Sequence, residues 1–186
     1  MIASILFVLF AGSFMIIRAK PVHQDEESIP TLTVCEALSH AARYDGKIVR
    51  IRDRIVGTSE STSFLGEACP GIFVTDGKVW PSAIAWTMPT ATSSIIHNVN
   101  FSFDWESGEK WNKKWSKLNK QFSDQCIAAT FTGMFEIWSP SAARKLDSKG
   151  NQYELLGFGH LNEKPAQLVL KSADDVIPIP NCKAKK

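Results

Sequence analysis

Three arginines at alternate positions are the residues whose type and spacing most directly suggest binding chemistry. Arg50, Arg52 and Arg54 lie in the segment 47–56, where mostly apolar residues occupy the positions between them. A guanidinium group holds a carboxylate or a phosphate through paired hydrogen bonds. The arginine face therefore predicts an anionic ligand, a polymer or a peptide, with the loop 57–70 as the rim of its site. The alternative is a solvated strand face whose arginines pair with local carboxylates.

A stripe of aromatic and aliphatic residues marks the segment 108–122. Trp111, Trp115, Leu118 and Phe122 recur at helical spacing, and five lysines occupy the other faces. Such an amphipathic helix can lie on an anionic membrane or dock on an envelope partner. The contacts would then be Trp111, Trp115, Lys113 and Lys114. The alternative is that the tryptophans pack against the body of the protein while the lysine stems cover apolar surface.

Residues that could serve catalysis are scattered along the chain. His160 lies in a local pattern between Gly159 and Leu161, but no cysteine, serine or spaced acid accompanies it. Asp174 and Asp175 are adjacent, which is not the spacing of a general acid and its base. We therefore expect a non-enzymatic protein without a cofactor.

Four cysteines bear on the compartment. They are widely spread, with no Cys-x-x-Cys pair and no histidine at ligand spacing, which argues against a zinc site or any other metal site. Beside an export signal, four cysteines predict two disulfides with three connectivities open. The alternative is four buried free thiols. The cysteines are Cys35, Cys69, Cys126 and Cys182.

The N-terminal segment predicts export. Residues 2–17 are uncharged and apolar, and the sequence Arg18-Ala-Lys-Pro21 follows them. At about 1.5 Å per residue, a helix of this length falls short of a hydrocarbon core of about 30 Å. A signal peptide cut after Ala19 is the leading interpretation. Because no lysine or arginine precedes the apolar run, a retained short anchor is the alternative, and in both cases the body lies outside the cytoplasm, in the periplasm or secreted.

Length and composition fit one globular domain. The chain has 186 residues, of which 44% are hydrophobic and 22% charged. Its net charge of +2 is too small to indicate nucleic acid as a partner. We divide the chain into a signal peptide or anchor (1–19), a flexible acidic lead-in (20–30), a folded domain (31–182) and a basic tail (183–186).

The folded domain reads as a mainly β protein with two helices. A capping box at Thr33 and Glu36 begins a helix that ends at Asp45-Gly46. Asp53 interrupts the apolar face of the strand 47–56, and a β-bulge there would account for it. Asp76-Gly77 predicts a hairpin. The expected strands are 47–56, 71–75, 78–80 with a resumption at 82–86, 127–137, 153–156 and 166–171; the expected loops are 57–70, 87–103 and 139–152.

This order, with one helix before the strands and one between the third and fourth, is the layout of a five-stranded OB-like Greek-key barrel. Further pieces of the chain carry a resemblance; they are Thr33–Leu38, Tyr44–Arg52, Cys69–Phe73, Phe131–Phe135, Gly157–Leu161 and Gln167–Leu170. These pieces resemble parts of small exported bacterial OB-fold-like proteins, and Cys69–Phe73 is similar to the second strand of those proteins. The resemblance covers residues 31–177 in pieces, and a glycine is expected where this chain has Asp53. It implies the fold and an exported location, and no established activity.

The sequence thus favours an extracytoplasmic binding or interaction module, without enzymatic activity, whose ligand is anionic. An envelope-associated structural protein that docks through the 108–122 helix is the second hypothesis. An enzyme of unknown reaction is the third.

Overall fold

The computed structural model describes most of the domain. The predictions of a signal peptide or anchor, of a basic tail and of a structural or catalytic role for His160 concern residues outside the described part. No helix in the described part is long and apolar enough to cross a membrane. The described residues are 28–57, 62–66, 69–75, 77–90, 95–122, 126–139, 144–146, 152–154, 156–159 and 162–180.

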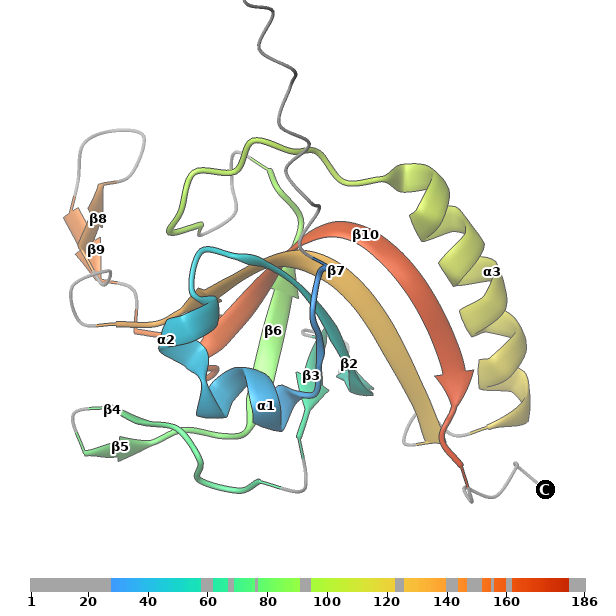
Figure 1. Ribbon diagram of the computed structural model, residues 1–186, viewed down its shortest axis with the longest axis horizontal. Coiled ribbons are helices and arrows are strands. Elements are labelled where there is room, and N and C mark those ends of the chain that lie inside the picture. Colours follow the sequence, from blue (N-terminus) through green and yellow to red (C-terminus); the bar gives the residue numbers. More distant parts are fainter. Residues whose placement is uncertain are drawn as a thin grey trace, which may run out of the picture.

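Five strands close into a barrel, which confirms the mainly β prediction (Figure 1). Each neighbouring pair in the ring is antiparallel except β6 and β10, which are parallel. The ring order is β2, β3, β6, β10, β7 and back to β2. The short strand β1 (Thr31–Leu32) adds to β2 in parallel. The barrel strands are β2 (Ile48–Gly57), β3 (Thr62–Leu65), β6 (Ala83–Thr87), β7 (Ile127–Ile137) and β10 (Ala166–Pro178).

Apolar side chains from all five strands fill the barrel. On β2 the predicted alternation is confirmed, because Val49, Ile51 and Ile55 are buried while Arg52 is exposed. Period-two alternation places every second side chain inside, so the arginines face outward. Other fully buried members of this core are Phe64, Ile84, Phe135 and Leu168.

Asp53 is accommodated without a β-bulge. The pairing of β2 with β7 runs without a register shift through this residue. The Asp53 carboxylate accepts a hydrogen bond from the backbone N–H of Val34, at 3.0 Å. An acid on the apolar face is tolerated here because it satisfies a donor at the start of a helix.

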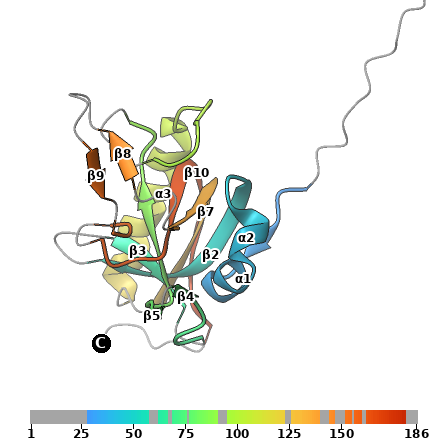
Figure 2. The ribbon, with the colours of Figure 1, turned by 90° about the vertical axis from the view of Figure 1, so that its left-hand side faces the viewer.

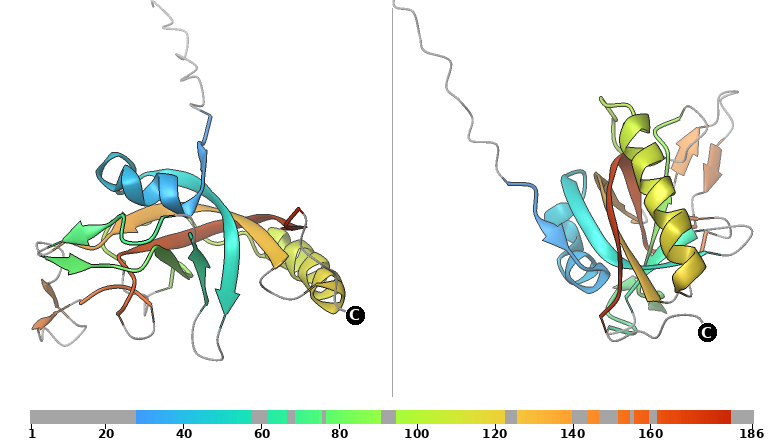
Figure 3. Two further views of the ribbon diagram at one scale, coloured as in Figure 1. Left: turned by 90° about the horizontal axis from the view of Figure 1, so that it is seen from below. Right: turned by 90° about the vertical axis from the view of Figure 1, so that its right-hand side faces the viewer.

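Two short helices replace the single N-terminal helix that the sequence predicts. The capping box of Thr33 and Glu36 is confirmed at the start of α1 (Val34–Ser39). The chain breaks at His40 before α2 (Ala41–Tyr44), and the positive φ of Gly46 then turns it into β2. The longer α3 (Trp105–Gln121) lies along β10, on a different side of the barrel from α1 and α2 (Figure 3).

The segment 57–70 is not the long loop that the sequence predicts, because it contains β3. This strand supplies Phe64 to the core. The predicted hairpin does form, as β4 (Val74–Thr75) and β5 (Lys78–Val79), but it is a separate two-stranded sheet outside the barrel. The second and third barrel strands are therefore β3 and β6, and the correspondence of 69–73 to the second strand is wrong.

Two further strands depart from the prediction. The predicted loop 139–152 contains β8 (Arg144–Leu146), which pairs with β9 (Gln152–Glu154), close to the short strand predicted at 153–156. This hairpin and the β4–β5 hairpin project from the body, on the side away from α3 (Figures 1 and 2). The last strand, β10, continues to Pro178, because two register shifts against β7 carry the pairing past Lys171 and through Asp174 and Asp175.

A disulfide joins Cys35 in α1 to Cys69, which precedes the β4–β5 hairpin. Cys126 is also disulfide-bonded, and Cys182 lies outside the described residues. No cysteine in the described part is free. The alternative of four free thiols is therefore wrong.

Candidate functional site

The helix α3 and its contacts with the barrel form the walls of two hollows. Its start is fixed by Asp104, whose carboxylate caps the N–H groups of Glu106 and Ser107. The Asp104 N–H in turn donates to the carbonyl of Lys171 in β10, at 2.8 Å. The Ser107 hydroxyl accepts from the N–H of Ala173, at 3.0 Å. These bonds hold the first turn of α3 against β10.

Trp111 anchors the middle of the helix. Its ring stacks on Trp115 with centroids 5.3 Å apart and lies 5.2 Å from the ring of Phe131 in the barrel. Its indole N–H donates to the carbonyl of Asp175, at 3.0 Å. Trp111 and Trp115 are half-buried, so the aromatic stripe of the helix packs against the barrel.

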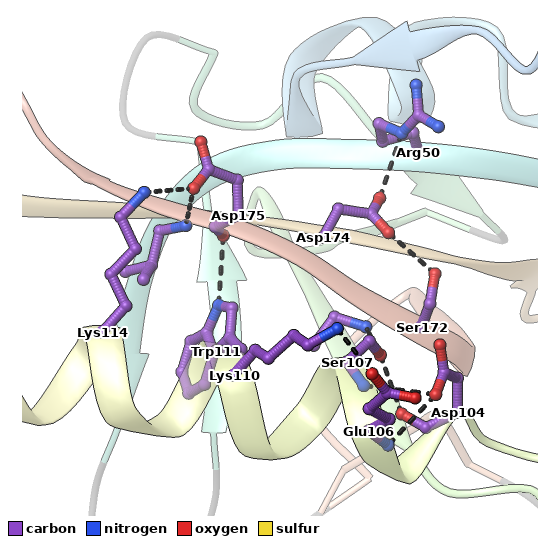
Figure 4. A pocket seen from close by; sticks show the side chains of 12 residues that line it. Arg50, Asp104, Glu106, Ser107, Lys110, Trp111, Lys114, Ser172, Asp174 and Asp175 are labelled. Atoms are coloured by element: carbon purple, nitrogen blue, oxygen red, sulfur yellow. Dashed lines mark hydrogen bonds and ion pairs between the residues drawn. The ribbon is translucent and has the colours of Figure 1, made fainter.

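A charged groove of about 680 Å³ lies between α3 and β10 (Figure 4). Arg50 bonds to Asp174 at 3.0 Å, and Lys114 bonds to Asp175 at 2.5 Å. Lys110 bonds to Glu106 at 2.6 Å. Each cation in the groove therefore has an acidic partner, so its charge is largely neutralised within the protein.

The network around Asp175 stabilises the ionised carboxylate. Burial alone would raise the pKa of Asp175. The bonds from Lys114 and from the N–H of Val176 act against burial and outweigh it. The positive charges of Lys114 and Arg52 act in the same direction, so the pKa lies below its ordinary value of 3.8.

The three arginines do not converge on one site. Arg50 lines the groove and also bonds to Thr132. Arg52 is exposed and donates to the hydroxyl of Thr130, at 2.8 Å. Arg54 is further along β2, half-buried, and does not line the groove. The expected rim at 57–70 is occupied in part by β3.

A second hollow, which we call the aromatic pocket, lies on the other side of Trp111. Its volume is about 310 Å³. Trp86 and Phe131 meet edge to face, with centroids 4.5 Å apart, and Phe103 meets Trp105 in the same way at 5.0 Å. The main apolar walls are Trp86, Met88, Phe103, Trp105, Trp111 and Phe131; the polar lining residues are Glu109 and Asn112.

A glycine in the first turns of α3 and an exposed tryptophan at its start shape this pocket. A Cβ atom at Gly108 would lie 2.8 Å from the ring of Phe103, so a glycine is what lets this ring lie against the first turns of α3. Trp105 remains 67% exposed and forms the outer wall. The sequence alone did not reveal the pocket, because Trp86, Phe103 and Trp105 lie outside the helical stripe and come from different elements.

Two histidines of the described part contact side chains that could act with them in proton transfer: His40 lies 2.9 Å from the Ser39 hydroxyl, and His97 pairs with Asp45. A histidine–carboxylate pair joins His97 to Asp45 at 3.0 Å, and the N–H of Ile137 donates to the same carboxylate. No hydroxyl or thiol in the described part hydrogen-bonds to the side chain of His97 or of Asp45. Within the described ranges, no group of three histidine, cysteine, aspartate or glutamate residues could hold a metal ion.

Comparison with known proteins adds no relative. No family model, no curated protein and no solved structure matches this chain.

Proposed function

We propose that this chain is an OB-like barrel that acts as a non-enzymatic ligand-binding module outside the cytoplasm. The ring order of the five strands supports the OB-like assignment, since the third and fifth strands along the chain, β6 and β10, are neighbours and parallel. The position of α3 between β6 and β7 in the chain supports it as well. A Greek-key barrel of this kind commonly presents a binding surface rather than a catalytic centre.

The disulfide supports a location outside the cytoplasm. Disulfides such as Cys35–Cys69 persist in oxidising compartments and are rare in the cytosol. The apolar segment 2–17 would direct the chain there, as a cleaved signal peptide or a short anchor.

The aromatic pocket is the observation that carries the binding function. Ligand pockets are typically concave, mostly apolar and at least about 300 Å³ in volume, with a few polar groups that fix orientation. The aromatic pocket has about this volume, and five of its eleven lining residues are tryptophan or phenylalanine. We propose that a small, largely apolar molecule binds here, between α3 and the barrel.

Ligand-observed NMR with a library of small aromatic and aliphatic fragments tests this proposal. We expect several fragments to bind and Trp105→Ala to weaken their binding about fivefold, because the variant removes the outer aromatic wall and the loss of a tryptophan contact commonly costs about 1 kcal/mol or more. Lys117→Ala is the control, since Lys117 is exposed on the same helix and lines neither the pocket nor the charged groove. A library without a hit, or hits that bind Trp105→Ala unchanged, would refute the proposal.

An anionic ligand on the outer face of β2 is the second candidate. The observation in its favour is Arg52, which is exposed and bonds to the Thr130 hydroxyl; its charge also acts on Asp175, but within 4.0 Å it forms no ion pair with a described residue. Binding to an array of anionic glycans and oligonucleotides should then weaken with added salt. It should also be lost on replacing Arg50, Arg52 and Arg54 by glutamate. Salt-insensitive binding, or binding that survives the triple replacement, would exclude this candidate.

A further inference from the structure

We infer that the ligand of the aromatic pocket is an organic cation, an ammonium group that carries apolar substituents. This inference rests on the proposed binding function and specifies the chemical class of the ligand. It follows from the charge, the rings and the size of the pocket.

The charge of the pocket is one-sided. Glu109 lines it, and none of the described residues in its lining is a lysine or an arginine, although α3 alone carries five lysines. The neighbouring acidic side chains already have partners within the protein, because the Asp104 carboxylate caps α3 and Glu106 bonds to Lys110. A ligand with a positive charge would therefore complement the pocket.

Glu109 has no partner of its own. Among the described residues it makes no hydrogen bond or ion pair, and Lys113, one helical turn later, does not pair with it within 4.0 Å. The carboxylate is exposed at the rim, so it is hydrated and available to a ligand. An ion pair at the edge of an apolar pocket is stronger than one in open solvent because fewer waters screen it.

The tryptophan rings provide a second interaction that favours a positively charged ligand. The face of a tryptophan ring attracts an ammonium group within about 6 Å of its centre, more strongly when water is excluded. Trp111 is held in place by its bond to the Asp175 carbonyl and by stacking on Trp115. Trp105 is 67% exposed, so part of its ring is accessible to a ligand.

The size of the pocket restricts the ligand to a small molecule or to one end of a larger one. Its volume of about 310 Å³ is at the lower limit of ligand pockets in general. A methylated or alkylated ammonium group suits such a space, because its carbon atoms satisfy the apolar walls while its charge faces Glu109.

The test compares choline with 3,3-dimethylbutan-1-ol, its neutral analogue with carbon in place of nitrogen. We expect choline to bind at least tenfold more tightly, as measured by NMR titration of the full protein. Glu109→Gln should weaken choline binding about fivefold or more and leave the alcohol unchanged, and Trp105→Ala should weaken both. Glu163→Gln is the control, since Glu163 is exposed, lies outside the pocket lining and has no partner among the described residues, and it should change neither affinity.

Each failure has a distinct meaning. Equal affinities for the two probes, or a Glu109→Gln variant that binds choline normally, would overturn the inference that the ligand is a cation. The pocket would then remain a site for neutral apolar molecules. If neither probe binds while library fragments do, the inference fails and the proposed function stands. If fragments also fail to bind, both are wrong.

Discussion

The side chain of Glu136 has no exposed surface, yet it is a carboxylate and holds three parts of the molecule together. One oxygen accepts the N–H groups of Ile96 and His97 at 2.8 and 2.7 Å. The other accepts the side-chain amide of Gln167 in β10, at 2.6 Å. A buried carboxylate is tolerated when several donors satisfy it.

Replacing Glu136 tests that role. Glu136→Ala leaves three donors without an acceptor, and each costs about 1–3 kcal/mol. We expect the free energy of unfolding in urea to fall by about 3 kcal/mol or more. Glu136→Gln keeps one carbonyl oxygen and should lose less. If the two variants lose the same amount, or each loses less than about 1 kcal/mol, the carboxylate does not hold these segments.

The pKa of Asp175 predicts an effect of pH on stability. Because the folded protein holds this pKa below its ordinary value of 3.8, the ionised form is bound more favourably in the folded chain. The resulting stabilisation is fully present above the unfolded pKa of about 3.9. It is lost as the pH falls through the folded pKa.

We therefore expect Asp175→Asn to be less stable than the natural chain at pH 7, and this difference to disappear as the pH falls below about 4. The loss at pH 7 should be about 1 kcal/mol or less, since the pair of Asp175 and Lys114 is partly exposed. Urea unfolding of both proteins at a series of pH values measures it. Glu163→Gln is the control, because Glu163 is exposed and has no partner among the described residues. A pH-independent difference would contradict the prediction.

At the scale of elements, the barrel depends on the close approach of β7 and β10. A Cβ atom at Gly133 would collide with the backbone carbonyl of Val169. Gly133→Ala should therefore force the two strands apart at a cost of about 2 kcal/mol or more, as over-packing does. Gly77→Ala is the comparison that measures backbone strain without a steric clash, because the added Cβ atom would meet open space while the φ angle of Gly77 is positive. It should cost about 1–2 kcal/mol. Thermal unfolding that shows no loss for Gly133→Ala would contradict the prediction.

Strands with a long alternating pattern could be predicted from the sequence, and short ones could not. The ranges of β2 and β7 follow from period-two alternation over about ten residues. The strand β3 has four residues in a Ser/Thr-rich segment, with Phe64 as its buried anchor, so its pattern is too short to distinguish it from a loop. The turn signal at Asp76-Gly77 correctly gave a hairpin, but a local turn does not reveal which sheet the strands join.

The candidate site was less predictable than the barrel, because long-range contacts build it. Arg50 pairs with Asp174, which is 124 positions away in the chain. That pairing requires β10 to continue past Lys171 through two register shifts against β7, and no sequence pattern predicts these shifts. The aromatic pocket likewise gathers residues from β6, α3, β7 and the segment before α3, so its components have no common spacing.

At the scale of the whole molecule, the Cys35–Cys69 disulfide ties α1 to the chain that leaves β3. The contact there is already close, since a Cβ atom at Gly66 would lie 2.9 Å from Val34 and 3.1 Å from the sulfur of Cys35. The disulfide spans a sequence separation of 34 residues. Closing a loop of this length in the unfolded chain removes entropy worth about 3–4 kcal/mol.

The double variant Cys35→Ala/Cys69→Ala should therefore be less stable by about 3–4 kcal/mol in urea. Removing both cysteines together avoids a new free thiol and leaves the bond of Cys126 intact. The loss should come from the unfolded state, so the ligand affinity of the aromatic pocket, on the other side of the barrel, should not change. A variant as stable as the natural chain would mean that packing between α1 and Gly66 already restrains this segment. A variant that loses binding while remaining folded would mean that α1 and the pocket are coupled through the barrel.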